Sequence, residues 1–116
     1  MKIIIAPEKE TKKYLKPSAK IINRFFQNKP INQNAFINLH FVSPQKIKVL
    51  NCKYRQLDKA TSVLSFPLFE NIGQIPKKGP VILGDIFISQ GKDTLDKQTL
   101  ADLIEHSLEH LIGKHH

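Results

Sequence analysis

Residues 35–44 read AFINLHFVSP and predict a β-strand that leads directly into an α-helix. The first part of this stretch alternates partly between apolar and polar side chains and is rich in strand formers. Ser43 and Pro44 match a helix start, with serine as the cap and proline in the first turn. The helix is expected to run from about Gln45 to Lys53, so the chain contains both strands and helices.

Further strands and one long loop are expected on either side of this stretch. The strands are short and cover residues 3–6, 61–66 and 81–89, of which the last is mostly apolar. Residues 70–80 contain glycines and prolines at close intervals, which predicts a loop. Together these segments predict a small mixed β-sheet.

Helices are expected before and after the strands. Residues 8–26 can form one or two helices, broken near Pro17 because proline fits poorly inside a helix. The last helix is expected over residues 93–112, because its apolar residues recur with helical period on one side. That core-facing stripe consists of Leu100, Ile104, Leu108 and Leu111. The prediction is an α+β fold in a single domain, residues 1–116, in which helices pack on the small mixed sheet.

The composition is typical of a globular protein that stays out of membranes. The chain has 116 residues, 41% of them hydrophobic and 24% charged, which suits one domain with a modest core. Its apolar runs are too short for a bilayer span or a signal peptide. Cys52 is the single cysteine, so no internal disulfide can form. Its side chain is expected to be partly buried. These features favour a cytoplasmic location.

The net charge of +8 favours an anionic partner, of which nucleic acid is the commonest. The basic residues are dispersed over residues 9–24 and 46–59. The dispersed charge gives a general preference for RNA or DNA and is no evidence for sequence-specific recognition of either. Many small basic proteins bind no specific partner, and that alternative stays open here.

The end of the chain carries a histidine pattern typical of a metal site. His106 and His110 are four residues apart, so a helix places both on one face. Gly113 can adopt the left-handed conformation that ends a helix, and the chain can then bring His116 to the same ion. Three imidazoles with an open fourth position describe a catalytic zinc site better than a closed structural one. The alternatives are solvent-exposed histidines and a final pair left from a purification tag.

Four motifs, in chain order, resemble those of the YbeY family of bacterial endoribonucleases. They are NCKYR at residues 51–55, DKATSVLSFP at 58–67, LGDIFIS at 83–89, and the histidine pattern at 106–116. The resemblance covers about residues 51–116, and the last motif is the most specific. It implies an α+β metal-dependent fold, a cytoplasmic bacterial setting, and a role in ribosomal RNA maturation and ribosome quality control.

The same resemblance implies roles for individual residues. It makes His106, His110 and His116 the ligands of one zinc ion, Zn²⁺, and places Arg55 in the active-site cleft. A guanidinium group suits phosphate binding and stabilises charge in the transition state. The alternative for Arg55 is a surface position or an ion pair with Asp58. RNA, ribosomal RNA in particular, is the implied partner, with the ribosome and its proteins as further candidates.

Four positions depart from the family pattern. Ser62 stands where aspartate is usual, Ser107 where glycine is usual, and Glu109 where an apolar residue is usual. His115 replaces the aspartate before the last histidine, which leaves the third ligand open between His115 and His116, although the spacing favours His116. The chain also ends where family members usually continue, so a truncated chain and a divergent member are both open.

Three functions fit these patterns. The first is a zinc-dependent endoribonuclease, and the second is a non-catalytic RNA- or ribosome-binding module with a structural or degenerate zinc site. The third is a metalloprotease of the metzincin type, whose general-base glutamate directly follows the first histidine. Ser107 occupies that place, and Glu109 lies on the opposite flank of the histidine pair, so the protease fits least well.

Overall fold

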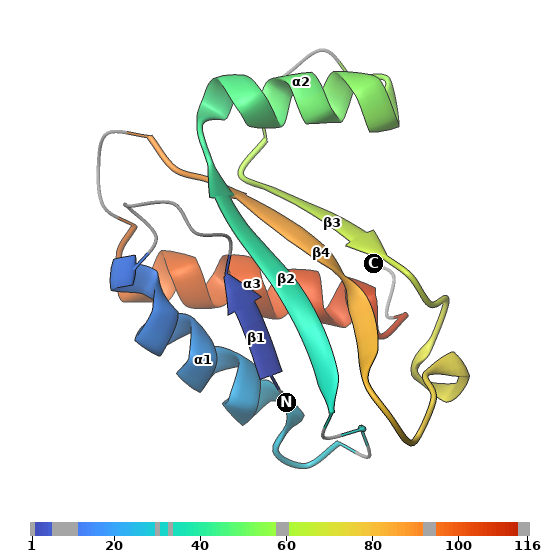
Figure 1. Cartoon of the computed structure of the whole chain (residues 1–116). Coiled ribbons are helices and arrows are strands. Elements are labelled where there is room, and N and C mark those ends of the chain that lie inside the picture. The colour runs from blue at the N-terminus through green and yellow to red at the C-terminus, as the bar shows by residue number, and fades with distance from the viewer. Residues whose placement is uncertain are drawn as a thin grey trace.

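The fold is a four-stranded mixed sheet with helices on both of its faces, as the computed structural model shows (Figure 1). It describes residues 2–5, 12–29, 31–32, 34–57, 61–91 and 95–113. The strands are β1 (Lys2–Ile5), β2 (Ala35–Val42), β3 (Val63–Pro67) and β4 (Val81–Ser89), and the helices are α1 (Lys12–Phe26), α2 (Pro44–Arg55) and α3 (Lys97–Leu111). A short 3₁₀ helix, Ile72–Gln74, lies in the loop before β4. The predicted α+β class is confirmed.

The strand order is β1-β2-β4-β3, so β2 and β4 form the centre of the sheet and β3 forms one edge. The β1–β2 and β2–β4 pairs are parallel, whereas β3 runs antiparallel to β4. The bounds of β2 and β4 agree with the prediction from their apolar patterns. Residues alternate along β2: Ile37, Leu39 and Phe41 are buried, while Asn38 and His40 are partly exposed on the other face.

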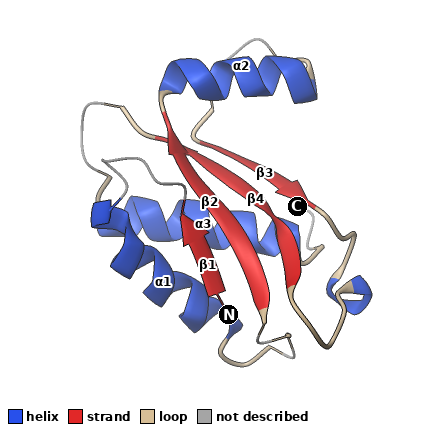
Figure 2. Ribbon diagram, in the orientation of Figure 1, coloured by secondary structure: helices blue, strands red, loops and turns tan. Residues whose placement is uncertain are grey.

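The buried face of the sheet is covered by α1 and α3, which lie side by side along it (Figure 2). All four residues of the predicted stripe on α3, Leu100, Ile104, Leu108 and Leu111, are almost completely buried. They belong to one hydrophobic core with side chains of α1, β2 and β4. This packing fixes the rotation of α3 and therefore determines which of its side chains face solvent.

The predicted break of α1 at Pro17 is wrong. The helix runs without interruption from Lys12 to Phe26, with Pro17 inside it. A proline inside a helix costs about 3 kcal/mol, since one backbone hydrogen bond is lost. Burial of Ile22 and Phe26 against the sheet offsets this cost, because each buried large apolar side chain contributes about 1.5–3 kcal/mol.

The helix α2 packs on the opposite face of the sheet from α1 and α3, at one end of β2 (Figure 1). Ser43 caps it as predicted, since its hydroxyl oxygen accepts a hydrogen bond of 3.1 Å from the backbone N–H of Lys46. Ile47 is buried with Val42 and Leu64 in a second, smaller hydrophobic cluster. Cys52 is exposed, so the expectation that it is partly buried is wrong. The helix α2 packs on the sheet with one side only, through Ile47, and Cys52 lies on its other side, which faces solvent.

The sheet has an irregularity between its two central strands, at a place where the end of α3 lies close to β4. The register between β2 and β4 shifts between Phe36 and Asn38. Gly84 lies in this irregular part with φ +153°, and a Cβ there would lie 2.5 Å from the carbonyl oxygen of Phe66. Only glycine therefore fits at this position.

Among the described residues no helix is long and apolar enough to cross a membrane.

Candidate functional site

The helix α3 carries the histidine pair and is held firmly at its N-terminus. Asp96 is the cap, and its carboxylate accepts hydrogen bonds from the backbone N–H of Thr99 at 2.7 Å and from the Thr99 hydroxyl at 3.1 Å. The backbone hydrogen bond is the largest cause, and the hydroxyl bond the second, of a lowered pKa for Asp96. The cap and the buried stripe together fix both the start and the rotation of the helix.

His106 and His110 lie next to each other on one flank of α3, as predicted. Their ring centroids are 4.6 Å apart with the rings tilted by 53°. His106 is exposed and His110 is partly buried, so both rings are accessible from solvent. Two imidazole nitrogens that bind one zinc ion tetrahedrally lie about 3.3 Å apart, because each lies about 2.0–2.1 Å from the metal. The observed ring separation is compatible with two such converging nitrogens.

Gly113 ends the helix in the way that the sequence predicted. Its φ is +89°, in the left-handed region, and its N–H donates to the carbonyl oxygen of His110 at 3.1 Å. A Cβ on Gly113 would clash with the carbonyl oxygen of Glu70 and would lie 2.7 Å from Cα of Asn71. The chain therefore turns tightly against the loop before β4 immediately after the histidine pair.

The third predicted ligand, His116, and its alternative, His115, lie outside the described residues. Among the residues that are described, no group of three or more His, Cys, Asp or Glu side chains is arranged to hold a metal ion. His106 and His110 thus form two parts of a possible metal site, with donors of the type that zinc prefers.

Arg55 is the last residue of α2 and is exposed. The next residue, Gln56, has φ +58°, and its backbone N–H donates to carbonyl oxygens of Asn51 and Cys52. A left-handed glutamine is unusual, and it turns the chain sharply away from α2 just after Arg55. Asp58, the predicted alternative partner of Arg55, lies outside the described residues.

The edge strand β3 lies between the helix of Arg55 and the helix of the histidines. Both α2 and α3 contact β3, although they pack on opposite faces of the sheet. An edge strand leaves backbone N–H and C=O groups without a neighbouring strand. A ligand that approaches this edge can therefore meet side chains from both helices.

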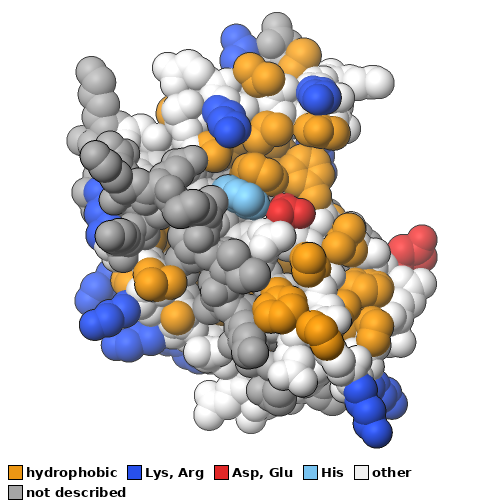
Figure 3. Space-filling model, viewed as in Figure 1, with side chains coloured by type: hydrophobic (Ala, Val, Ile, Leu, Met, Phe, Trp, Pro, Cys, Tyr) orange, Lys and Arg blue, Asp and Glu red, His pale blue; other side chains and the backbone are white. Residues whose placement is uncertain are grey.

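A polar pair on the open face of the sheet was not predicted. His40 Nε2 and Asp85 Oδ1 are 3.1 Å apart, and the His40 ring stacks on Phe87 with centroids 4.3 Å apart. Figure 3 shows a histidine and an acidic side chain side by side in a hollow beneath α2, with hydrophobic side chains around them. The alternation in residues 35–42 could have predicted the position of His40, because it places this residue on the face of the strand opposite the core.

Aromatic side chains connect this pair with the end of α2. The Phe87 ring lies edge-to-face with Phe66, and Phe66 lies edge-to-face with Tyr54, at centroid distances of 5.7 and 5.5 Å. Tyr54 directly precedes Arg55 and is 58% exposed. The cluster therefore extends from the open face of the sheet to the end of α2.

Ser107, one of the departures from the family pattern, is fully buried on the core side of α3. Its hydroxyl has no hydrogen-bond partner among the described residues. Position 107 therefore does not share the solvent-facing flank of His106 and His110.

The fold is similar to a solved structure from a thermophilic bacterium. The solution structure of TM1509 from Thermotoga maritima matches with a TM-score of 0.59 and 24% identity, over 96% of this chain and 71% of that chain. At this level of identity the likeness shows the fold alone.

Sequence relatives carry the description Endoribonuclease YbeY. The relative from Agathobacter rectalis is 31% identical over 89% of this chain and 76% of its own length. The relative from Aquifex aeolicus is 38% identical over 72% of this chain and 57% of its own length. The relative from Oceanobacillus iheyensis is 34% identical over 78% and 66%, respectively. The chain thus spans between 57% and 76% of the length of these relatives.

The family model described as Endoribonuclease YbeY matches residues 4–116, nearly the whole sequence. This match includes the motifs on α2, β3, β4 and α3 from which the resemblance was inferred. The chain belongs to the endoribonuclease YbeY family.

Proposed function

We propose that this chain, residues 1–116 folded as one domain, is a zinc-dependent endoribonuclease that acts in ribosomal RNA maturation. The single observation that carries the proposal is the pair His106 and His110, whose rings lie together on the solvent-facing flank of α3. Membership of the endoribonuclease YbeY family supports RNA as the substrate. A ribosomal RNA substrate favours a cytoplasmic location, in contact with ribosomes.

The histidines hold the metal in this proposal. His106 and His110 supply two imidazole ligands from rigidly packed α3, and His116 supplies the third, with His115 as its alternative. When bound, zinc polarises a phosphoryl oxygen and makes water a better nucleophile near neutral pH. The tight turn at Gly113 supports a third ligand from the end of the chain, because it redirects the chain directly after the pair.

Arg55 binds the phosphate in this proposal. Its guanidinium group is exposed at the end of α2, so it can reach a phosphate that lies along β3. A guanidinium group remains charged at all physiological pH values and donates two parallel hydrogen bonds to a phosphate. It can therefore stabilise the extra negative charge on the phosphoryl group in the transition state.

The burial of Ser107 argues against the protease alternative. A metzincin needs a carboxylate at the position directly after the first histidine. That position is fully buried here, so a glutamate would point into the core rather than to the metal. Only a measurement of RNA cleavage distinguishes the enzyme from the alternative of a non-catalytic binding module.

The proposal is tested by cleavage of single-stranded RNA with protein loaded with zinc. The wild type is expected to cut RNA, and His110→Ala to lose both zinc and cleavage. Asp102→Ala, which changes an exposed residue of the same helix, serves as the control and is expected to retain both. RNA cleavage by metal-free His110→Ala would contradict the mechanism, and RNA binding without any cleavage by the zinc-loaded wild type would favour the binding module.

A further inference from the structure

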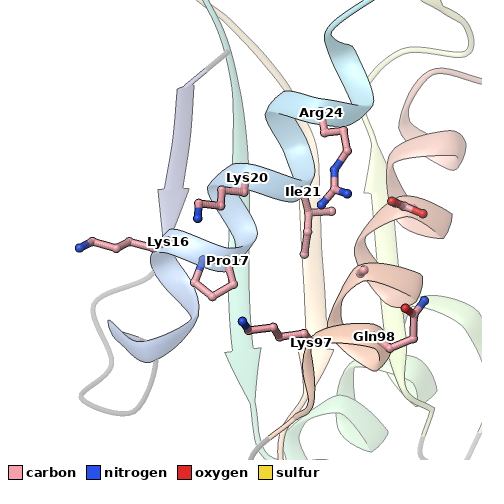
Figure 4. Close-up of a pocket in the computed structure, with 9 residues that line it drawn as sticks. Lys16, Pro17, Lys20, Ile21, Arg24, Lys97 and Gln98 are labelled. Atoms are coloured by element: carbon pink, nitrogen blue, oxygen red, sulfur yellow. The ribbon is translucent and has the colours of Figure 1, made fainter.

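A basic groove runs between α1 and α3 on the side of the molecule away from α2. It has a volume of about 500 Å³. Its cations are Lys16, Lys20 and Arg24 from α1 and Lys97 from the start of α3. Figure 4 shows Arg24 and Lys97 extending from their two helices into the space between them, while Lys16 and Lys20 extend from α1 farther from α3.

The charge in this groove is strongly one-sided. Four cations and the single carboxylate of Glu105 give a local charge of +3. The salt bridge found among the described residues joins His40 to Asp85, on the other face of the sheet. None of the four cations forms a salt bridge with a described carboxylate, and Glu105 offsets only part of their charge. Their mutual repulsion is unfavourable without a ligand, and an anion in the groove would relieve it.

The shape of the groove suits a chain of phosphates better than a single anion. Lys16, Lys20 and Arg24 recur every four residues, so they form a row about 12 Å long on α1, at 1.5 Å of rise per residue. The lining between the cations is partly apolar, from Pro17, Ile21 and Ala101. A row of cations on a partly apolar base can follow a sugar–phosphate backbone.

The groove is separate from the histidine pair. Ala101 and Glu105 line it, so it occupies the flank of α3 that faces α1. His106 and His110 lie on another flank of that helix, since each residue turns the helix by about 100°. We infer that this groove binds the phosphate backbone of a single-stranded RNA outside the catalytic site and so increases the affinity for long substrates.

The length of the RNA then decides whether the groove contributes. A substrate that reaches both places must pass around α3, whose diameter with side chains is about 10–12 Å. A long RNA can bridge this distance, whereas a dinucleotide bound at the histidines is too short to do so. The groove therefore affects binding of long RNA and leaves the cleavage rate of a dinucleotide unchanged.

The test compares two double variants that change the net charge equally. Lys20→Glu with Arg24→Glu reverses two charges in the groove, and Lys77→Glu with Lys78→Glu reverses two exposed charges in the loop before β4. The affinity for a long single-stranded RNA is measured by fluorescence titration over a range of salt concentrations. The groove variant is expected to bind roughly ten-fold more weakly, and the control to bind nearly as well as the wild type.

A milder variant guards against misfolding. Lys20→Gln with Arg24→Gln removes two charges, and the salt dependence of its RNA affinity is expected to fall by about 1.4 in slope, since each phosphate contact contributes about 0.7. Unchanged affinity and slope in this variant would overturn the inference, and so would equal losses in the groove and loop variants. If the groove binds an acidic protein instead of RNA, the RNA affinity and its salt dependence would stay unchanged in this variant.

The inference rests on the proposed function for its choice of RNA, yet the two can fail separately. Binding is measured without cleavage, so an inactive protein whose RNA affinity still depends on the groove would contradict only the endoribonuclease proposal. A protein that cleaves the dinucleotide but binds long RNA equally well in both double variants would contradict only the groove.

Discussion

Leu111 packs so closely against Gly84 that residue 84 has no room for a side chain. A Cβ at position 84 would lie 2.8 Å from Cδ2 of Leu111. Leu111 is the last residue of α3 and directly follows His110. The missing side chain at residue 84 therefore allows the end of the helix that carries the histidine pair to lie close to the sheet.

Gly84→Ala is expected to destabilise the protein by about 3 kcal/mol, because overpacking and an unfavourable backbone conformation act together. The nearest atoms are a backbone oxygen, at 2.5 Å, and a buried leucine, so neither can move away easily. Urea unfolding followed by circular dichroism measures the effect. Gly91→Ala is the control, since a Cβ there has nothing within 4 Å, and it should change stability by less than about 0.5 kcal/mol. Equal effects of the two changes would contradict this account of residue 84.

Gly113→Ala is expected to weaken zinc binding by about ten-fold or more, because the turn after the histidine pair would have to move. Its natural control is Gly79→Ala, since Gly79 also has a positive φ, +80°, but no atom lies within 4 Å of a Cβ there. The left-handed backbone should cost each variant about 1–2 kcal/mol of stability, and the clash with the loop before β4 adds to this cost for Gly113→Ala alone. Zinc affinity, measured by competition with a coloured chelator, should fall only for Gly113→Ala. Equal zinc affinities would show that this turn does not position a ligand.

The cap of α3 predicts how stability depends on pH. Hydrogen bonds from Thr99 hold the pKa of the Asp96 carboxyl below its usual 3.8. Because the pKa is lower in the folded state, the ionised cap stabilises the fold fully at pH values above the unfolded-state pKa. This stabilisation is lost as the pH falls through the folded-state pKa. Asp96→Asn keeps an accepting oxygen without the charge. Thermal unfolding of both proteins from neutral pH to below 3.8 should therefore show a larger loss of stability for the wild type. Parallel curves would contradict the role assigned to the charged cap.

Arg55→Ala is expected to lower kcat for RNA cleavage by about a hundred-fold or more, with little change in stability. The reason is that Arg55 is exposed at the end of α2, so its removal disturbs little packing. Lys53→Ala removes an exposed cation from the same helix end and serves as the control. Arg55→Lys should restore only part of the activity, because an ammonium group cannot form paired hydrogen bonds with a phosphate. If Arg55→Ala and Lys53→Ala lowered kcat by the same small factor, Arg55 would contribute only general positive charge and no specific contact to the phosphate.

Much of the fold was predictable because strong local patterns coincide with strong packing. The alternation in β2 and the apolar run in β4 gave the bounds of both strands, and Ser43 with Pro44 gave the start of α2. Pro17 misled the prediction, because its cost to a helix is local while burial of α1 against the sheet is a tertiary effect.

The candidate site was predictable only in its local part. The i,i+4 spacing and Gly113 gave the histidine pair and its turn, since both depend on the geometry of a single helix. The pair of His40 and Asp85 was missed because residues from two strands, 45 positions apart, meet only through the register of the sheet. The groove between α1 and α3 was missed for the same reason, since its cations become neighbours only when the two helices pack.

The zinc content of untagged protein, determined by elemental analysis, tests the central claim most directly. The wild type is compared with a double variant, His106→Ala with His110→Ala, and both are incubated with zinc and then freed of unbound metal. The account predicts about one zinc ion per chain in the wild type and almost none in the double variant. A wild type that binds no zinc, or a double variant that retains as much as the wild type, would contradict it.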